Sequence, residues 1–231
     1  MDSKTTAIIV IAAIIIAVCA FFLFYFQGST PGSEAGGTAA LSRIEVRSYE
    51  GKDLSSISDF RENSIRGPQY VNISDYRLVI AGLTNKTDSY TYSDVLNMYP
   101  HYTKVVTLFC VEGWDVTILW EGVLVRDLIG TEGIDPRANT VIFTAHDGYT
   151  TSFPLEYLIN NDIILAYRMN NVTLPAERGY PFQLVAEDKW GYKWIKWIEK
   201  IELSDDPNYR GYWEQRGYSN SADLERNYFS N

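Results

Sequence analysis

Residues 104–120 read KVVTLFCVEGWDVTILW, and this segment carries the clearest structural signal in the chain. Its first part, 104–111, is rich in apolar and β-branched residues and predicts a buried strand. The overlapping stretch 115–130 predicts another strand, a tight turn at Glu121–Gly122 and then a short helix. Cys110 stands between the two strands. The segment therefore predicts a β-rich core with one cysteine at the end of a strand.

Strands also dominate on both sides of this segment. Further strands are expected at 44–51, 76–83, 139–147, 163–171, 181–188 and 194–203. Two short helices interrupt them, at 92–98, where Ser93 or Asp94 helps to cap the start, and at 154–160. A turn is expected at Asn170–Asn171. This pattern predicts the α+β class, with a mixed sheet or barrel-like core.

The composition is that of a globular protein and excludes one class of partner. Hydrophobic residues make up 46% of the 231 residues, and the formal net charge is −9. A nucleic-acid-binding protein typically carries a basic patch and a basic total, so nucleic acid is not an expected partner.

The N-terminal part contains an apolar run long enough to span a bilayer. Ala7–Phe26 has twenty apolar residues without a charge. Lys4 precedes the run, and the next Lys or Arg is Arg43, which predicts a cytoplasmic N-terminus at 1–6 and a domain outside the cytoplasm. The alternative is a cleaved signal peptide, because Lys4 is the one basic side chain before the run, which is a weak signal for a retained anchor.

The segment after the apolar run differs in composition from the rest. Residues 27–40, QGSTPGSEAGGTAA, are rich in small residues and nearly uncharged. Such a composition is typical of a flexible linker. The expected organisation is thus a membrane anchor at 7–26, a linker at 27–40 and one folded domain at 41–231, located at the cell membrane on its extracytoplasmic side.

Cys110 leaves three readings open. A free cysteine is often a small buried hydrophobe. A thiolate can also be a nucleophile, as in a thiol hydrolase, with His146 and the adjacent Asp147 as activating partners. The third reading is a metal ligand. Zinc is a poor candidate, because outside the apolar run the chain offers only Cys110, His101 and His146, without paired ligand spacing.

A cluster of lysines and aromatic residues follows near the C-terminus. The segment DKWGYKWIKWIEK, 188–200, interleaves four lysines with Trp and Tyr in an otherwise acidic chain. One reading is a solvated face beside an aromatic core. The other is an anion site, in which lysine ammonium groups and turn N–H groups hold a phosphate, together with the basic turn AERGYP at 176–181. A phosphate site together with a thiolate indicates a phosphorylated cofactor that carries a metal.

Several segments in order resemble one known family. They are FRENSIRGPQ, YRLVIAGL, LFCVEGW, WEGVLVRDLI, VIFTAHDGYTTSFPLE, DIILAYRMNNVTLPAERGYPFQLV, GYKWIKWIEKIEL and GYWEQRGY. From about Asp59 to Asn220 the chain is similar to the molybdopterin-binding domain of the sulfite oxidase family, which also forms the catalytic subunit of bacterial periplasmic methionine-sulfoxide reductases. The resemblance implies a molybdopterin-dependent oxidoreductase that transfers an oxygen atom in a two-electron step.

The resemblance assigns roles to individual residues. Cys110 in LFCVEGW occupies the place of the family's molybdenum ligand, and Tyr149 in YTTSFP occupies the place of its active-site tyrosine. Contacts to the pterin or its phosphate are implied for a further set: Arg61, Glu62, Asn63, Ala145, His146, Arg178, Lys193 and Lys196.

The chain departs from the family in ways that concern substrate and partner. Sulfite oxidases carry arginines soon after the ligand cysteine, whereas Val111–Trp114 has none. Gln183 replaces an arginine of the reductase-type relatives, so one cofactor contact is expected to differ. Electrons are expected to pass to or from a separate haem or quinone-linked membrane partner, and the substrate is a small-molecule or protein-bound oxo compound. The rival hypothesis is a metal-free surface module that binds a partner through aromatic residues.

Overall fold

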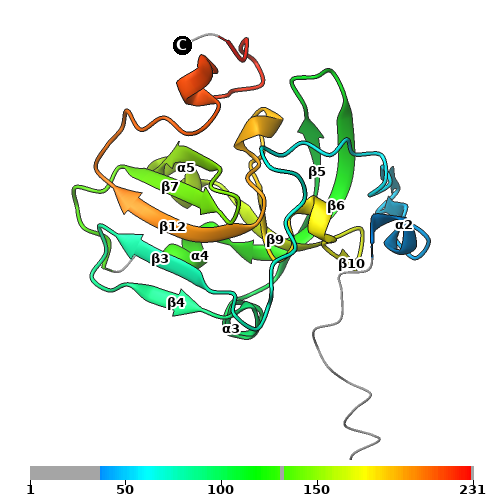
Figure 1. Cartoon of the computed structure of the whole chain (residues 1–231), viewed down its shortest axis with the longest axis horizontal. Helices are drawn as coiled ribbons and strands as arrows, with labels where there is room; N and C mark the ends of the chain where they lie inside the picture. The colour runs from blue at the N-terminus through cyan, green and yellow to red at the C-terminus, as the bar shows by residue number, and fades with distance from the viewer. Residues whose placement is uncertain (1–36, 131–132, 230–231) are drawn as a thin grey trace, which may run out of the picture. The chain divides into compact units, whose positions relative to one another are not determined.

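The computed structural model describes residues 37–130 and 133–229 (Figure 1). The expected N-terminus at 1–6 and anchor at 7–26 lie outside the described residues, as does most of the expected linker. Within the described ranges, no helix has the length and apolar character needed to cross a membrane. The described residues belong to one compact unit, Ala35–Asn231.

One five-stranded sheet is built around the segment with the clearest sequence signal. Its order is β10-β9-β6-β5, with β11 also paired to β9, and every pairing is antiparallel. The strands are β5 Tyr102–Phe109, β6 Asp115–Leu124, β9 Ile164–Met169, β10 Val172–Thr173 and β11 Gln183–Val185. β5 and β6 form a hairpin in register from Tyr102↔Gly122 to Phe109↔Asp115. Cys110 therefore lies at the tip of this hairpin.

A second five-stranded sheet is mixed. Its order is β4-β3-β12-β7-β8, and β12 runs parallel to β3 while the other pairs are antiparallel. The strands are β3 Leu78–Gly82, β4 Asp88–Tyr90, β7 Thr140–Ala145, β8 Thr150–Pro154 and β12 Ile198–Ser204. The expected α+β class with mixed sheets is thereby confirmed.

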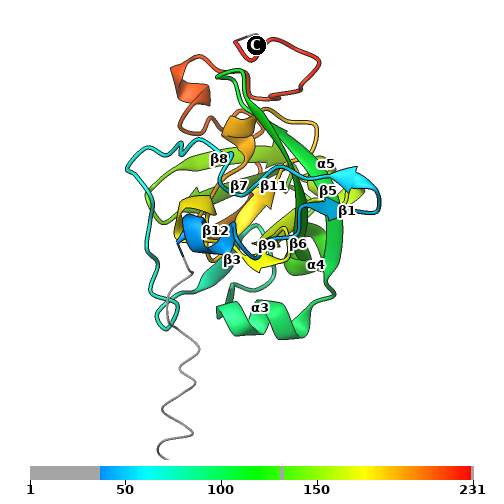
Figure 2. The ribbon, with the colours of Figure 1, turned by 90° about the vertical axis from the view of Figure 1, so that its right-hand side faces the viewer.

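Short helices and turns complete the described part of the chain. They are α2 Thr38–Leu41, α3 Tyr92–Met98, α4 Val125–Ile129, α5 Leu155–Asn160 and the 3₁₀ turns η1 Ala176–Arg178, η2 Gly191–Lys193 and η3 Glu214–Arg216. Figures 1 and 2 both show the C-terminal segment on the side of the molecule where the β5–β6 hairpin ends.

The core lies between the two sheets and is apolar. Trp120 and Leu124 of β6 are fully buried, as are Phe143 of β7 and Ile201 of β12, and all four belong to one cluster of buried side chains. Burying such side chains is the main favourable contribution to folding. The site described below is thus held on two rigid sheets rather than on loops alone.

The prediction of a turn at Glu121–Gly122 is wrong. β6 continues through both residues, and its pairing with β9 shifts register at that point. A Cβ on Gly122 would lie 2.1 Å from the carbonyl oxygen of Leu165, so only glycine permits this close approach. The sequence pattern was misread because a glycine inside a strand can mark a bulge or a close contact instead of a turn.

Three expected strands are clearly shorter than predicted, and one of them, expected at 181–188, reduces to β11, Gln183–Val185. The strand expected at 44–51 reduces to β1, Ser48–Tyr49, which pairs with β2, Lys52–Asp53, across a turn in which Glu50 and Gly51 have positive φ. The strand expected at 194–203 begins only at Ile198, because η2 and the positive φ of Trp197 precede it.

The start of α3 differs in detail from the expectation. Its N-cap is Thr91, and neither Ser93 nor Asp94 occupies that position. Asp94 nevertheless helps, because its carboxylate accepts the N–H of Thr91 at 2.8 Å while the Thr91 hydroxyl accepts the N–H of Asp94. This reciprocal pair is a capping box. The turn expected at Asn170–Asn171 is confirmed, with positive φ at both residues.

Candidate active site

The hairpin tip fixes the position of Cys110. β5 ends at Phe109, and the N–H of Cys110 donates to the carbonyl of Trp114 at 2.9 Å. The N–H of Gly113 donates back to the carbonyl of Cys110 at 3.0 Å, and Gly113 has φ 81°. That left-handed conformation favours glycine, which explains the residue at this place in the turn. The thiol is 8% exposed and is held by a hydrogen-bonded turn.

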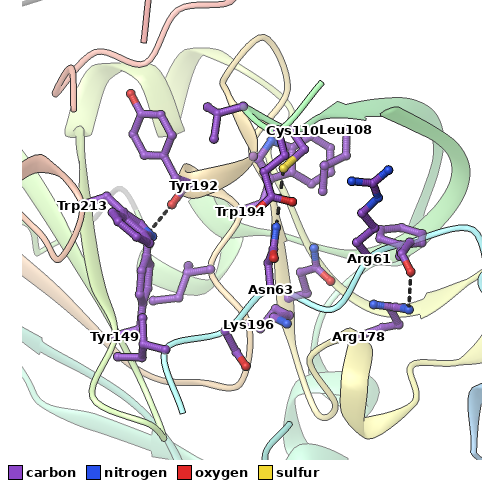
Figure 3. Close-up of a pocket in the computed structure, with 18 of the residues that line it drawn as sticks. Arg61, Asn63, Leu108, Cys110, Tyr149, Arg178, Tyr192, Trp194, Lys196 and Trp213 are labelled. Carbon is purple, nitrogen blue, oxygen red and sulfur yellow. Dashed lines mark hydrogen bonds between the residues drawn. The ribbon is translucent and has the colours of Figure 1, made fainter. Parts of the chain in front are cut away.

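A cavity of about 250 Å³ lies beside Cys110 (Figure 3). Asp147 and Tyr149 contribute to it from the turn between β7 and β8. Its other walls come from the loop 60–65, the hairpin tip 108–114, and the segments 177–183, 191–197 and 213–218. Parts of the chain that are far apart in sequence thus meet at one thiol, as is typical of an active site.

The Cys110 thiol is the free cysteine of the described part of the chain. Burial raises its pKa above the ordinary value, although hydrogen bonds from the backbone of Glu112 and from the side chain of Asn63 act in the opposite direction. The Nδ2 of Asn63 lies 3.6 Å from Sγ (Figure 3). Without a cation this thiol stays protonated near neutral pH, and a bound metal ion would deprotonate it.

The two histidines do not activate this thiol. The Nδ1 of His146 contacts Glu199 at 2.5 Å, and the Nδ1 of His101 contacts the Tyr167 hydroxyl at 2.6 Å. Neither histidine lines the cavity. A thiol hydrolase needs a base within hydrogen-bond reach of its nucleophile, so the geometry gives that reading no support.

One side of the cavity carries two arginines that form no close ion pair, although Glu112, Asp147 and Glu177 also line the cavity. Arg178 is 7% exposed, and its guanidinium donates to the carbonyls of Ile57 at 3.3 Å and Phe60 at 3.1 Å. Within the described ranges, no carboxylate lies within 4 Å of Arg178 or of its neighbour in the cavity, Arg61. Burial lowers the pKa of Arg178. The negative charges of Glu177 and Glu62 act in the opposite direction. A buried cation without a close ion pair is still costly, so the negative charge of a ligand would stabilise it.

Lys196 adds a third cation to this side. Its Nζ donates to Glu62 at 2.9 Å and to the carbonyl of Glu177 at 3.3 Å, and it lies 4.3 Å from the centre of the Trp197 ring. Among the described residues, its third N–H bond thus has a ring contact but no hydrogen-bond acceptor. Lys196 lines the cavity, whereas Glu62 does not. The pair thus joins the loop 60–65 to the segment 191–197 at the rim of the cavity.

Lys193 is not brought to the cavity. Its side chain is fully buried, and Nζ donates to Glu214 at 2.6 Å, to the carbonyl of Ser152 at 2.9 Å and to Asn220 at 3.5 Å. These contacts use all three of its N–H bonds. Lys193 therefore has no N–H bond left to donate to a phosphate. Its contacts instead connect η2 to β8 and to the C-terminal segment.

Tyr149 lines the cavity on the side opposite the arginines (Figure 3). Its hydroxyl donates to the backbone carbonyl of Tyr192, and burial raises its pKa well above the ordinary value. The phenol therefore remains a hydrogen-bond donor at any ordinary pH. Ala145 and His146 come just before it in the chain, but neither lines the cavity. Ala145 is buried in the core, and His146 is exposed.

Buried polar atoms without partners indicate that the cavity is shaped for a polar ligand. Ser64 Oγ and Gln183 Oε1 are buried and have no hydrogen-bond partner, and both residues line the cavity. Gln183 is 3% exposed. An unpaired buried polar group costs about 1–3 kcal/mol, so such groups usually await a partner. Together with the thiol and the unpaired arginines, they fit a large anionic cofactor with a thiolate-bound metal.

No protein-only metal site competes with this reading. Across residues 37–130 and 133–229, no group of three or more His, Cys, Asp or Glu side chains could hold a metal ion. A metal at Cys110 would therefore need most of its ligands from another molecule. A thiolate is a soft ligand and favours transition metals over hard cations such as Mg²⁺ or Ca²⁺.

The sequence pattern missed the aromatic side of the cavity. Tyr192, Trp213 and Tyr218 line it, and two of them come from the C-terminal segment, in which the sequence predicted neither a strand nor a helix. Their rings pack together, with centroids 5.0 Å apart for Tyr192 and Tyr218 and 5.2 Å apart for Trp213 and Tyr218. The density of aromatic residues in that segment was the available signal.

Comparison with known proteins agrees with the geometry. The model of the family described as "Oxidoreductase molybdopterin binding domain" matches residues 65–213. The chain belongs to this family. It is therefore a molybdopterin-dependent oxidoreductase, and its cofactor is the molybdenum cofactor. The resemblance seen in the sequence is confirmed.

Individual relatives differ in how much of their length the chain covers. YuiH, an uncharacterized oxidoreductase of Bacillus subtilis, is 30% identical over 161 residues, which are 69% of this chain and 80% of that protein. YedZ1 of Azospira oryzae, a putative protein-methionine-sulfoxide reductase subunit, is 32% identical over 150 residues, 64% of this chain and 56% of that protein. The chain thus spans only about half of the second relative.

A solved structure shares the fold. The sulfane dehydrogenase SoxCD from Paracoccus pantotrophus matches with a TM-score of 0.59 and 24% identity, over 67% of this chain and 43% of that one. At this identity the likeness supports the fold of the family domain and no more.

Proposed function

We propose that this protein is a membrane-anchored oxidoreductase that works outside the cytoplasm and holds molybdenum through Cys110. The observation that carries the proposal is the position of the buried Cys110 thiol, 3.6 Å from the Asn63 amide, in the wall of a cavity that is also lined by Arg61, Arg178 and Lys196. When bound, the cofactor supplies two-electron oxygen-atom transfer, and the protein binds and orients the reactants.

Each side of the cavity has a distinct part in this proposal. Arg178, Arg61 and Lys196 hold the negative charge of the pterin phosphate, because they supply N–H donors without a full set of protein acceptors. The unpaired oxygens of Ser64 and Gln183 accept hydrogen bonds from the polar edge of the pterin. Asn63 donates to the Cys110 sulfur and so tunes the thiolate.

Tyr149 is the proposed hydrogen-bond donor to the substrate. Its hydroxyl donates to the carbonyl of Tyr192 in this structure, and rotation of the O–H bond about the C–O bond would free the proton for a substrate in the cavity that Tyr149 lines. Because its pKa is raised, it donates a hydrogen bond without losing its proton. A neutral donor of this kind stabilises negative charge that develops on a substrate oxygen.

The location and the partner follow from the sequence. The apolar run at 7–26 supports a single-pass anchor with the catalytic domain on the extracytoplasmic side. Among the described residues no second metal centre is available, so electrons would pass to or from a separate haem or quinone-linked membrane protein. The substrate is an oxo compound, either a small molecule or a group on another protein.

Metal content tests the proposal directly. The full chain is expressed in a host that makes molybdenum cofactor, beside Cys110→Ser and the control Cys19→Ser, which removes the other cysteine of the chain. Near-stoichiometric molybdenum is expected in the unmodified chain and in Cys19→Ser. Cys110→Ser should lose the thiolate-to-metal absorption band, because oxygen replaces sulfur at the metal.

The opposite result has a clear meaning. A well-folded unmodified chain without molybdenum would refute the enzyme proposal and favour a metal-free module that binds a partner. If Cys110→Ser still contains molybdenum and its absorption spectrum is unchanged, Cys110 is not a ligand of the metal.

A further inference from the structure

The C-terminal segment, residues 205–229, contributes one wall of the cavity. Trp213 and Tyr218 of this segment line the cavity together with Tyr192, and we call these three residues the aromatic wall. Figure 3 shows Tyr149, Tyr192 and Trp213 together on one side of Asn63, and Arg61 and Arg178 on the other. The cavity thus has an aromatic side and, opposite it, a side with two arginines.

The aromatic wall is supported from behind by further rings. Tyr218 packs on Phe229 with centroids 4.9 Å apart and on Tyr228 at 6.0 Å. The hydroxyl of Tyr192 donates to the carbonyl of Ser219 at 2.7 Å. Such aromatic pairs are favourable beyond the area that they bury. The wall is therefore a packed surface and not a set of independent side chains.

A buried ion pair connects the two parts of the wall. Glu214 follows Trp213 in the chain, and Lys193 follows Tyr192, and their charged atoms lie 2.6 Å apart with both side chains almost fully buried. The same oxygen of Glu214 accepts the hydroxyl of Thr151 at 2.7 Å. Each partner of the pair is thus the sequence neighbour of a wall residue, one on η2 and one on η3.

This pair is not explained by stability alone. Glu214 Oε2 is buried and has no hydrogen-bond partner. Burying two charges carries a large desolvation penalty, and apolar residues of similar size often serve stability as well or better. A pair of fixed geometry does, however, specify where η3 lies relative to η2. That is the property a binding wall needs.

We infer that the aromatic wall binds the apolar body of a neutral organic substrate, and that the Lys193–Glu214 pair holds the wall in place. The inference rests on the proposed function, since it concerns the same cavity. It makes Trp213 and Tyr218 specificity-determining residues and Lys193 and Glu214 positioning residues. Glu112, which lines the cavity at the hairpin tip, adds a negative charge that disfavours small oxyanions.

Inert substrate analogues separate binding from turnover. The probes are methyl phenyl sulfone and dimethyl sulfone, which share the sulfur–oxygen head and differ in the apolar body. Binding to the full-length, molybdenum-loaded protein is measured by calorimetry. The phenyl compound is expected to bind about tenfold more tightly or better, because burying a ring on the wall is favourable.

Three variants test the two parts of the inference. Trp213→Ala should abolish most of the preference for the phenyl compound. Glu214→Gln keeps the shape but leaves Lys193 without its counter-ion, so it should reduce the preference and raise hydrogen exchange of peptides from 205–229. Arg126→Gln, on α4, breaks an ion pair with Asp162 and should leave both quantities unchanged.

The outcomes distinguish this inference from the proposed function. If the loaded protein shows no preference for the phenyl compound, the wall is not a substrate surface. If Glu214→Gln binds and exchanges like the unmodified chain, the pair does not position the wall. Should Glu214→Gln fail to fold, the double variant Lys193→Met with Glu214→Leu replaces it and should still show raised exchange at 205–229. An absence of molybdenum from the unmodified chain would instead contradict the proposed function.

Discussion

The two lysines of the segment GYKWIK lie three residues apart and have opposite surroundings. Lys193 is fully buried on η2 and donates all three of its N–H bonds within the protein. Lys196 lines the cavity, pairs with a partly exposed Glu62 and keeps one N–H bond for another partner. The two residues are of the same type and belong to the same short motif, so only their neighbours distinguish a lysine buried in the packing from a lysine that lines the cavity.

The backbone between them produces this difference. Lys193 ends a 3₁₀ turn, and the chain then passes through Trp197, which has φ 52°, before β12 begins at Ile198. In a regular strand, residues three apart would point to opposite faces of one sheet. Here the backbone is irregular, so Lys193 packs against the C-terminal segment whereas Lys196 lines the cavity.

The largest expected effect comes from replacing Lys193. Lys193→Met should lower the free energy of unfolding by about 3–5 kcal/mol, because it leaves Glu214 buried without a counter-ion. The measurement is urea unfolding of the full chain. Lys193→Met with Glu214→Leu should recover most of the loss, since it removes both charges. If Lys193→Met lowers the free energy of unfolding by less than about 1 kcal/mol, the pair behaves as a solvent-exposed ion pair, which contradicts its burial in this structure.

Replacing Lys196 should give the opposite profile. Lys196→Met should change the free energy of unfolding by at most about 1 kcal/mol, because its partner Glu62 is partly exposed and screened by solvent. Cofactor retention should fall about tenfold or more, since one cation of the phosphate side is lost. Molybdenum per chain after extensive dialysis measures this. Equal retention in Lys196→Met and the unmodified chain would exclude Lys196 as a cofactor contact.

These cases show what the sequence could and could not reveal. Apolar runs predicted most strands of both sheets, and the position of Cys110 at the end of a strand was visible as a local pattern. The family resemblance brought Arg61, Asn63, Tyr149, Arg178 and Lys196 to the candidate site, and all five line the cavity. Their proposed roles are still to be tested.

The remaining features depend on long-range contacts. Lys193 carried the same local signal as Lys196, and its burial depends on Glu214, twenty-one residues later in a segment with no apolar periodicity. The same segment supplies Trp213 and Tyr218 to the cavity. At Gly122 the close approach of β9 decided the structure, and that neighbour is more than forty residues away. Local patterns describe single elements well, whereas packing partners belong to the whole fold.

The smallest expected effect concerns Glu62, the partner of Lys196. The contact between the Glu62 carboxylate and Lys196 has two effects. It neutralises the charge of Lys196, and it connects the loop 60–65 to the segment 191–197. Glu62→Gln keeps the size of the side chain and removes the charge that competes with an incoming anion. We expect inorganic phosphate to bind the cofactor-free variant about two- to fivefold more tightly, the range of a partly exposed ion pair.

Calorimetric titration with phosphate measures this, with Asp135→Asn as the matched control, because Asp135 pairs with Arg137 on the surface away from the cavity. Weaker phosphate binding in Glu62→Gln would mean that Glu62 orders the site for its ligand instead of competing with it. In that case the Lys196–Glu62 pair would resemble the Lys193–Glu214 pair in function, and the contrast between the two lysines would rest on burial alone.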